Sequence, residues 1–322
     1  MFPPSAKLVV VRNRMYANDR SKAESTSIRA FMKPPPFDYV RAGSVEETVA
    51  VLAKHGEDAK VIAGGQSLMP MLAFRVAAPK LVVDIGAVNA LRGVSIDSSG
   101  VLLGALTRWC DIERHPSLRK AHPLLVEAVG HVAHYQIRNR GTVGGSLAHA
   151  DPAAEFPGIC VACDATIEVV GIKGRRLVEA AQFFVGSLTT TLSHDELIVS
   201  VRFPPWKLER RWAFEEFARR RGDFALAGVA LFYDLSQSRA VDPRIAAIGV
   251  GSTPVRLTEA ERVLAGRVVD SSVSEQVVAA ATAAIAPADD IHAPGEYRRA
   301  LLGVLLERAL GRAAGMTHVV SA

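Results

Sequence analysis

The sequence predicts a protein of mixed helices and strands that is divided into two or three packed subdomains. Its 322 residues, 49% of them apolar, exceed what one compact core usually holds. Helix and strand signals alternate in the N-terminal part, strand-like runs dominate the middle, and the C-terminal part is helical. A chain of this size can bury enough surface to fold without disulfides or a structural metal.

Charge and cysteine content narrow the classes of function. The net charge of +5 is concentrated in residues 1–31, and only 6% of the residues are aromatic, so we expect no nucleic-acid surface. Cys110, Cys160 and Cys163 are too few for a disulfide framework and suit a reducing compartment. Cys160 and Cys163, with apolar flanks, are expected to be buried structural thiols. No apolar run reaches the roughly 18 to 20 residues of a membrane helix. The sequence therefore predicts a soluble, cytoplasmic protein without a membrane span.

Residues 1–31 show no sustained helical or strand periodicity and are expected to form a loosely ordered extension. Organised sequence begins directly after Met32, which makes this residue a candidate translation start. An intact mass of the native protein that begins at Met1 would refute this hypothesis.

A helix of about eleven residues is expected directly after Ser44. Ser44 and Glu47 form a capping-box pattern, and Gly56 supplies a left-handed stop. Apolar runs that follow predict buried strands, and further strand-like runs return after residue 165. The expected strands cover residues 59–63, 81–85, 101–105, 166–170, 196–203, 212–217, 225–235 and 245–251.

Two helices are expected between these groups of strands, at residues 107–113 and 124–134, followed by a turn-rich segment over 136–150. Thr258 and Glu261 form a second capping-box pattern. The Ala-rich segment 274–285 and a segment that Pro294 opens predict the last helices. Boundaries near residues 86 and 210 divide the chain into the expected units 1–31, 32–86, 87–210 and 211–322.

Two glycine pairs are the motifs in this sequence that indicate ligand binding. The first, Gly64-Gly65, follows an apolar strand and precedes Gln66 and Ser67. Adjacent glycines let the backbone approach a ligand and turn its N–H groups toward one point, which suits a phosphate or pyrophosphate, and Ser67 can cap the next helical turn. A tight strand-to-helix turn without a ligand would explain the same residues.

The second pair, Gly144-Gly145, lies between Thr142 and Ser146 in a turn-rich segment. The two hydroxyl groups and the glycine backbone can gather around a diphosphate, and a carboxylate several residues later can accept hydrogen bonds from sugar or ribityl hydroxyl groups. Neither loop matches the dinucleotide-binding signature G-x-G-x-x-G or the P-loop signature, which disfavours Rossmann and P-loop folds.

These motifs resemble the FAD-binding medium subunit of molybdenum hydroxylases. The resemblance rests on the segments 63–68, 142–152 and 219–227, the last with its run Gly-Asp-Phe-Ala-Leu-Ala, and on Tyr-Arg-Arg at 297–299. It covers about residues 32 to 315. The family includes the medium subunit of aerobic carbon monoxide dehydrogenase and the FAD-binding subunit of xanthine dehydrogenase.

The resemblance implies an α+β fold. It consists of a two-subdomain FAD-binding unit of the vanillyl-alcohol-oxidase (PCMH) type and a C-terminal α+β domain with a small antiparallel sheet of three strands. Residues 61–68 would line the pyrophosphate and adenosine side of FAD, and Glu155 would hold ribityl or ribose hydroxyl groups. The implied cofactor-binding residues are Lys60, Val61, Ile62, Ala63, Gly64, Gly65, Gln66, Ser67, Leu68, Thr142, Gly144, Gly145, Ser146, Asp151, Glu155 and Ile198.

The same resemblance implies an electron-transfer subunit of an oxidoreductase. Its partners would be a large molybdopterin-binding subunit and a small iron–sulfur subunit, arranged as a dimer of heterotrimers. This chain would pass electrons from the clusters to an external acceptor, and no catalytic residue or metal site is expected in it, because it lacks the cysteine quartets that clusters require. The alternatives are a stand-alone FAD-dependent oxidoreductase of the same fold that acts on an organic substrate, or a basic scaffold for nucleic acid or acidic partners.

One position departs from the family pattern. A relative with nicotinamide chemistry has a lysine near the flavin where this chain has Glu215. A carboxylate there would reverse the local field and disfavour an anionic reduced flavin, which argues against NAD as the acceptor.

Overall fold

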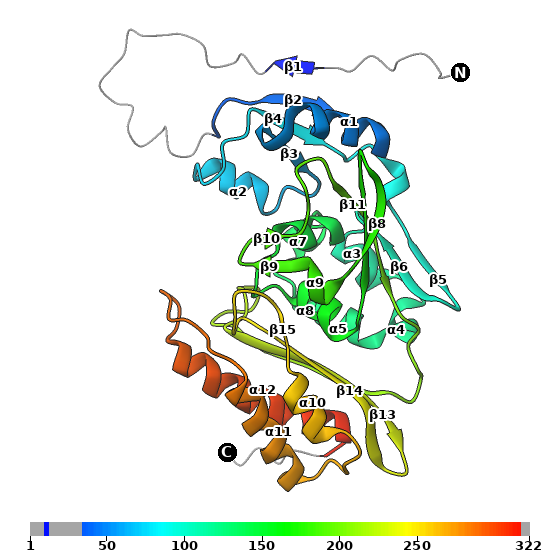
Figure 1. The fold of residues 1–322 in the computed structure, drawn as a ribbon, viewed down its shortest axis with the longest axis vertical. Coiled ribbons are helices and arrows are strands. Elements are labelled where there is room, and N and C mark those ends of the chain that lie inside the picture. Colours follow the sequence, from blue (N-terminus) through cyan, green and yellow to red (C-terminus); the bar gives the residue numbers. More distant parts are fainter. Residues whose placement is uncertain (1–9, 13–33, 317–322) are drawn as a thin grey trace.

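Three units follow one another along the long axis of the molecule (Figure 1). The computed structural model describes residues 10–12 and 34–316. Each unit contains a β-sheet of its own, and helices pack on all three sheets. The expected loosely ordered extension over 1–31 lies outside the described residues, except for strand β1 (Val10–Arg12).

The first unit holds a four-stranded sheet in the order β1-β2-β4-β3. Strands β2 and β3 run parallel to β4, and β1 runs antiparallel to β2. The other elements are β2 (Asp38–Arg41), α1 (Val45–His55), the 3-10 turn η1 (Gly56–Asp58), β3 (Ala59–Ile62), α2 (Leu68–Ala73) and β4 (Leu81–Asp84).

Helix α1 begins as the sequence predicts. The Ser44 hydroxyl accepts a hydrogen bond from the Glu47 N–H at 3.0 Å, while the Glu47 carboxylate accepts from the Gly43 N–H at 2.7 Å. The helix ends at Gly56, whose positive φ of 56° suits glycine.

The second unit is built on an antiparallel sheet of five strands in the order β5-β6-β11-β7-β8. A two-stranded ribbon of β9 and β10 lies beside it. Its strands are β5 (Val94–Asp97), β6 (Gly100–Gly104), β7 (Thr166–Gly171), β8 (Gly174–Glu179), β9 (Phe184–Gly186), β10 (Thr189–Thr190) and β11 (Leu197–Phe203). Its helices are η2 (Asn89–Leu91), α3 (Trp109–Arg114), α4 (Leu118–Ala121), α5 (Pro123–His131), α6 (Tyr135–Arg138), α7 (Val143–His149), α8 (Glu155–Ala162) and α9 (Ala180–Phe183).

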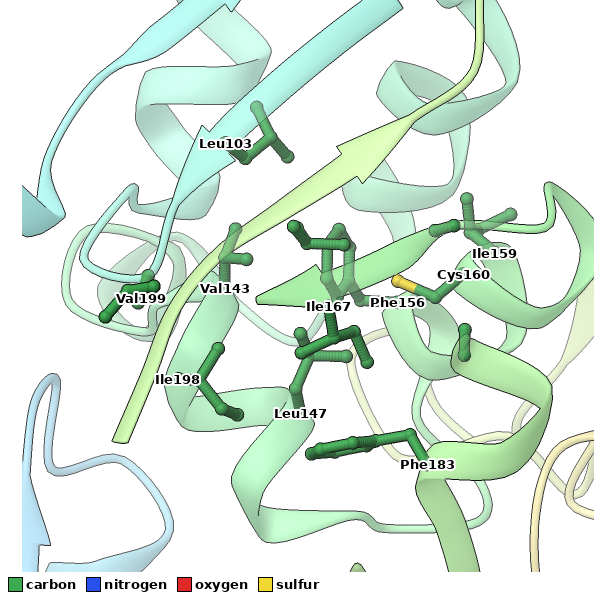
Figure 2. Close-up of a cluster of buried hydrophobic side chains, with 14 of the residues drawn as sticks. Leu103, Val143, Leu147, Phe156, Ile159, Cys160, Ile167, Phe183, Ile198 and Val199 are labelled. Carbon is green, nitrogen blue, oxygen red and sulfur yellow. The ribbon is translucent and has the colours of Figure 1, made fainter. Parts of the chain in front are cut away.

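The core of the second unit joins α7 and α8 to the sheet. Val143 and Leu147 of α7 pack among the side chains of Phe156, Ile167 and Ile198 (Figure 2). All eight residues of α8 are buried, as expected for a helix that is covered on every side. The core therefore fixes the first turn of α7, which carries the second glycine pair.

The third unit packs three helices on one face of an antiparallel sheet in the order β12-β13-β14-β15. The expected three strands are present, and β15, of only two residues, adds a fourth. The strands are β12 (Arg211–Phe217), β13 (Ala227–Ser236), β14 (Arg239–Ile248) and β15 (Val255–Arg256), and the helices are α10 (Thr258–Leu264), α11 (Ser271–Ala283) and α12 (Gly295–Ala314).

Two of the local predictions are wrong. The segment 136–150 is not simply turn-rich, because α6 and α7 occupy most of it. Thr258 and Glu261 do not cap α10, which has no side-chain cap. The Glu261 carboxylate instead accepts a hydrogen bond from the Ile245 N–H at 2.7 Å and pairs with Arg256.

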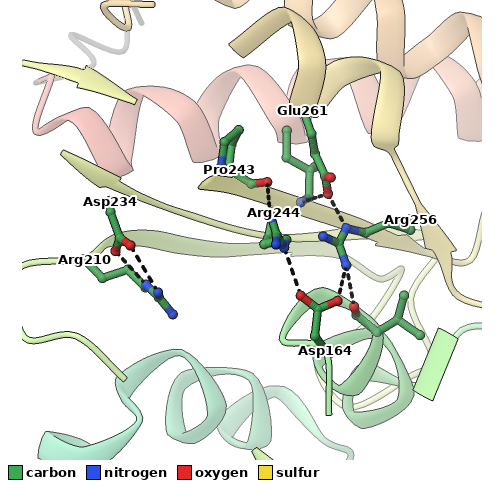
Figure 3. A network of polar contacts seen from close by, with 9 residues as sticks. Asp164, Arg210, Asp234, Pro243, Arg244, Arg256 and Glu261 are labelled. Atoms are coloured by element: carbon green, nitrogen blue, oxygen red, sulfur yellow. Dashed lines mark hydrogen bonds and ion pairs between the residues drawn. The ribbon is translucent and has the colours of Figure 1, made fainter. Parts of the chain in front are cut away.

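Ion pairs join the second and third units (Figure 3). Asp164, just after α8, contacts Arg244 of β14 at 2.9 Å and Arg256 of β15 at 2.7 Å. Arg256 also donates to the Val161 carbonyl of α8 at 3.1 Å. The boundaries near residues 86 and 210 stay a proposal; the first sheet ends at Asp84, and the third begins at Arg211.

Candidate cofactor site

A cavity of about 510 Å³ lies between the first and second units. Three segments form most of its wall: residues 56–68 of the first unit, residues 142–149 of the second, and residues 188–198 that lead into β11. Its volume falls within the ~300 to 1,000 Å³ typical of small-molecule sites. The two glycine pairs therefore face the same space.

The first glycine pair turns the chain from β3 into α2. Gly65 has a φ of +74°, a conformation that L side chains rarely adopt. The Gln66 amide folds back and donates to the Gly64 carbonyl at 3.0 Å. Ser67 begins α2, but its side chain makes no capping hydrogen bond, so the predicted Ser67 cap is wrong.

The two glycine loops touch each other. A Cβ added to Gly64 would collide with the backbone carbonyl of Arg140 and would lie 3.1 Å from the Gly141 Cα. The Arg140 guanidinium also donates to the Gly64 carbonyl at 3.4 Å. Only glycine at position 64 permits this approach, because any side chain would separate the loops.

The second glycine pair lies in the first turn of α7. Gly144 is held against β6, because its N–H donates to the Ala105 carbonyl at 2.8 Å, and an added Cβ would lie 2.7 Å from the Ala105 Cβ. The Thr142 hydroxyl accepts a hydrogen bond from the Gly145 N–H at 3.2 Å, which caps the helix. The same hydroxyl keeps its own hydrogen for donation into the cavity.

The third segment supplies contacts that the sequence reasoning missed. Of residues 188–198, only Ile198 was expected at the site. The chain enters this segment at Leu188, whose N–H donates to the Ala150 carbonyl at 3.1 Å just after α7. The hydroxyl-rich segment 189–193 is typical of a polar binding surface, but nothing in the sequence indicates that it lies beside α7 at the cavity. The additional lining residues are Leu188, Thr189, Thr190, Leu192, Ser193, His194, Glu196 and Leu197.

Most of the expected cofactor residues surround this cavity. Twelve of them line it: Lys60, Val61, Ala63, Gly64, Gly65, Gln66, Ser67, Leu68, Thr142, Gly144, Gly145 and Ile198. The four others, Ile62, Ser146, Asp151 and Glu155, are not among its lining residues, so their direct contact with a ligand stays a prediction.

Five titratable side chains line the cavity: Glu57, Lys60, His149, His194 and Glu196. His149 lines the cavity, and burial lowers the pKa of its imidazole while the charge of Asp151 opposes that shift. Glu215 does not line the cavity and pairs with Arg312 at 3.2 Å, so its charge is compensated there. The expected influence of Glu215 on a bound flavin stays untested.

All three cysteines are buried free thiols, which confirms the prediction for Cys160 and Cys163. Burial raises the pKa of the Cys110, Cys160 and Cys163 thiols, which keeps them protonated and unreactive. Within residues 34–316, no three His, Cys, Asp or Glu side chains gather as a metal ion would require. No helix of that region has the length and apolar character needed to cross a membrane.

Comparison with known proteins identifies the family. Residues 35–206 match the family model described as the FAD binding domain in molybdopterin dehydrogenase, and residues 212–313 match the CO dehydrogenase flavoprotein C-terminal domain. The chain belongs to the family of FAD-binding medium subunits of molybdenum hydroxylases. This medium subunit is therefore an oxidoreductase subunit with an FAD-binding domain, and the expected α+β fold is confirmed.

Similar proteins cover nearly the whole described chain. A subunit of the 6-hydroxypseudooxynicotine dehydrogenase complex of Paenarthrobacter nicotinovorans is 41% identical and aligns with 88% of this chain and 96% of its own. The carbon monoxide dehydrogenase medium chain of Hydrogenophaga pseudoflava is 39% identical over 88% of this chain and 98% of its own.

Solved structures agree with these sequence matches. A carbon monoxide dehydrogenase structure from Hydrogenophaga pseudoflava superposes with a TM-score of 0.86 at 38% identity and covers 88% of this chain and 99% of its own. Quinoline 2-oxidoreductase from Pseudomonas putida 86 gives a TM-score of 0.84 at 37% identity, with the same coverage of both chains.

The residues at the cavity fit an FAD molecule. A diphosphate requires small residues that let it approach the backbone closely, and Gly64, Gly65, Gly144 and Gly145 line the cavity from both units. The N–H groups of Gly144 and Gly145 are already bonded to Ala105 and Thr142, so this pair contributes space rather than donors. Lys60 adds a cation, Thr142 a hydroxyl donor, and the buried Ile198 an apolar surface. The cavity therefore offers the donor set that a flavin dinucleotide needs.

Proposed function

We propose that this medium subunit binds FAD between its two glycine loops and passes electrons from iron–sulfur clusters of a small partner subunit to an external acceptor. The observation that supports this proposal most directly is that both loops line one cavity and lie in contact through Gly64 and Arg140. The twelve lining residues named above are the proposed contacts. When bound, the flavin supplies the ability to accept electrons singly and to release them singly or in pairs.

The chain's own residues bind and orient the cofactor. The two glycine loops line the cavity from both units, and their lack of side chains would let the diphosphate approach the chain at two points. The Thr142 hydroxyl would donate to the same group while its oxygen caps α7. The segment 188–198 would close the third side and exclude water.

Substrate oxidation belongs to another chain in this proposal. This chain has three cysteines, all buried and raised in pKa, which cannot ligate an iron–sulfur cluster. We propose a large molybdopterin-binding subunit and a small iron–sulfur subunit as partners, arranged as a dimer of heterotrimers in the cytoplasm. The names of the relatives, a "medium chain" and a "complex subunit", support an assembly of several chains.

Purification of a tagged chain from its native cell tests this function. We expect a yellow preparation with one FAD per chain, together with a large molybdenum-containing chain and a small cluster-containing chain. Turnover of an organic substrate by the isolated chain would favour the stand-alone oxidoreductase instead. A chain that stays colourless after addition of FAD would refute FAD binding itself.

A further inference from the structure

Two buried carboxyl groups lie where the second unit meets the third, and the charge of Glu155 acts on Glu216. Glu155 is the first residue of α8 and is 4% exposed. Glu216 lies on β12, and its side chain is 6% exposed. Within residues 34–316, Glu155 forms no ion pair with a cation, and the Glu216 Oε2 atom has no hydrogen-bond partner.

Strand geometry explains why Glu216 lacks a cation. Successive side chains of a strand point to opposite faces, so Glu215 and Glu216 diverge. Glu215 faces α12, where Arg312 binds it at 3.2 Å, binds Glu127 at 2.7 Å and donates to the Phe214 carbonyl. Glu216 faces the interior, and the His131 imidazole lies 3.9 Å from its Oε1 atom.

The other charged groups around the pair do not neutralise it. On the α8 side, the charge of Asp151 adds to the repulsion that Glu155 experiences. On the α5 side, burial lowers the pKa of His131, and the charges of Arg312 and Arg221 act in the same direction, while those of Glu127 and Glu215 oppose it. His131 is therefore mainly neutral at neutral pH and supplies no fixed counter-charge.

Burial without a counter-ion keeps carboxyl groups protonated. Burial raises the pKa of Glu155 to about 7. Burial, and after it the charge of Glu155, raises the pKa of Glu216 to about 8. Two neighbouring carboxylates titrate as a coupled pair, so near neutral pH the pair carries about one proton more than two exposed glutamates would.

The chain links this pair to the cofactor cavity over a few residues. His149 lines the cavity at the end of α7, and Glu155 begins α8 six residues later. Asp151 lies between them, and its charge acts on both side chains. Negative charge that arrives in the cavity would therefore favour protonation along this segment.

We propose that Glu155 and Glu216 form a proton-binding site that takes up one proton from solvent when the neighbouring cofactor gains an electron. This inference rests on the proposed function. The electron comes from the iron–sulfur partner, the proton comes from water on the side of the partly exposed His131, and the only bond that forms is an O–H bond on a glutamate. When the electron leaves, the proton returns to solvent.

Infrared titration of the purified chain tests the proton site without the need for FAD. A protonated carboxyl group has a carbonyl stretch that its carboxylate lacks, so we expect this band to persist at pH 7 and to disappear above the pKa of about 8. Glu216→Gln and Glu155→Gln should each remove part of the band, and in Glu155→Gln the remaining part should titrate at lower pH. Glu209→Gln, at an exposed position, is the matched control and should change nothing.

Potentiometry of the FAD-loaded chain tests the coupling. The reduction potential of the wild type should fall more steeply with pH up to about pH 8 than that of the double variant Glu155→Gln/Glu216→Gln, because the variant takes up one proton fewer per electron. Absence of the carbonyl band at pH 7 in the wild type would overturn the proton site. Equal slopes in wild type and double variant would overturn its coupling to the cofactor. A chain that binds no FAD but shows the band would refute the proposed function and leave the proton site standing.

Discussion

The two loops need glycine mainly because neighbouring atoms leave no room for a side chain, and not only because glycine is flexible. Gly64 lies against the Arg140 carbonyl, and Gly144 lies against Ala105, so a side chain at either position would push backbone apart. Gly145 differs, because an added Cβ would meet only the Thr142 hydroxyl, at 2.8 Å. A substitution at position 145 would therefore disturb the cavity and displace the Thr142 hydroxyl, but it would push no backbone apart.

Gly145→Asp should abolish retention of FAD. The new carboxylate would lie at the cavity wall, where the proposed diphosphate binds, and would repel it. We expect the purified variant to lose its flavin absorbance while its far-ultraviolet circular dichroism stays that of the wild type.

Two control variants separate the effect of the added charge at position 145 from the effect of the added volume. Gly145→Ala adds the Cβ without the carboxylate and should keep part of the FAD. Gly130→Asp places the same carboxylate in α5, at an exposed glycine with no neighbour within 4 Å of an added Cβ, and should keep all of it. Normal flavin content in Gly145→Asp would contradict the assignment of this loop to the diphosphate.

The sequence predicted the glycine loops and their surroundings but not the whole cavity wall. Motif residues such as Gly64 and Thr142 have local signatures, because tight turns and helix caps depend on near neighbours. His194 and Thr190 reach the cavity only through tertiary packing of the segment before β11. Contacts between residues that are far apart in the sequence leave no local pattern from which they could be predicted.

At the level of single elements, helix caps show how tertiary contacts can override local signals. The pattern at Ser44 gave a real cap, whereas the same pattern at Thr258 did not. Glu261, which would complete that second capping box, is instead recruited by Ile245 and Arg256 from the neighbouring strands. Helix α7 was missed because two glycines in its first turn lower helix propensity by roughly 1 kcal/mol each, and burial of Val143 and Leu147 outweighs that cost.

Ser44→Ala should destabilise the chain by about 1 kcal/mol. The substitution leaves the Glu47 N–H without its acceptor at the first turn of α1. Urea denaturation followed by circular dichroism measures this loss.

Ser117→Ala is the matched comparison for the cap. Ser117 also precedes a helix, α4, but its side chain makes no capping hydrogen bond, so its replacement should change stability little. Equal effects of the two substitutions would mean that the Ser44 hydroxyl does not act as a cap.

For the molecule as a whole, the ion pairs around Asp164 hold the third unit against the second. Asp164 receives hydrogen bonds from Arg244 and Arg256, which outweigh the opposing effect of burial and lower the pKa of its carboxyl. A pKa that is lower in the folded state than in the unfolded chain gives stability above the unfolded value and loses it as the pH falls. The contribution of Asp164 should therefore be present at neutral pH and disappear in acid.

Asp164→Ala should loosen β15 and its contact with α8. We expect about 1 kcal/mol of lost stability at neutral pH and faster amide hydrogen exchange at Val255 and Arg256. The difference from the wild type should be smaller in strong acid, where only the cost of alanine at the positive φ of position 164 is left. Asp58→Ala removes a comparable pair with Lys80, but both of those side chains are more than half exposed, so this control should have almost no effect. Unchanged exchange in β15 after Asp164→Ala would show that other contacts hold this edge.

The position of the cavity makes the stability of this chain depend on the cell's supply of riboflavin. Opposite walls belong to sheets that do not hydrogen-bond to each other, so a molecule held between them bridges two parts of the chain that otherwise meet mainly through side chains and loops. A ligand that binds only the folded form raises its stability with the logarithm of the ligand concentration. Cells starved of riboflavin should therefore accumulate a heat-sensitive form of this polypeptide, although its amino-acid sequence is unaltered.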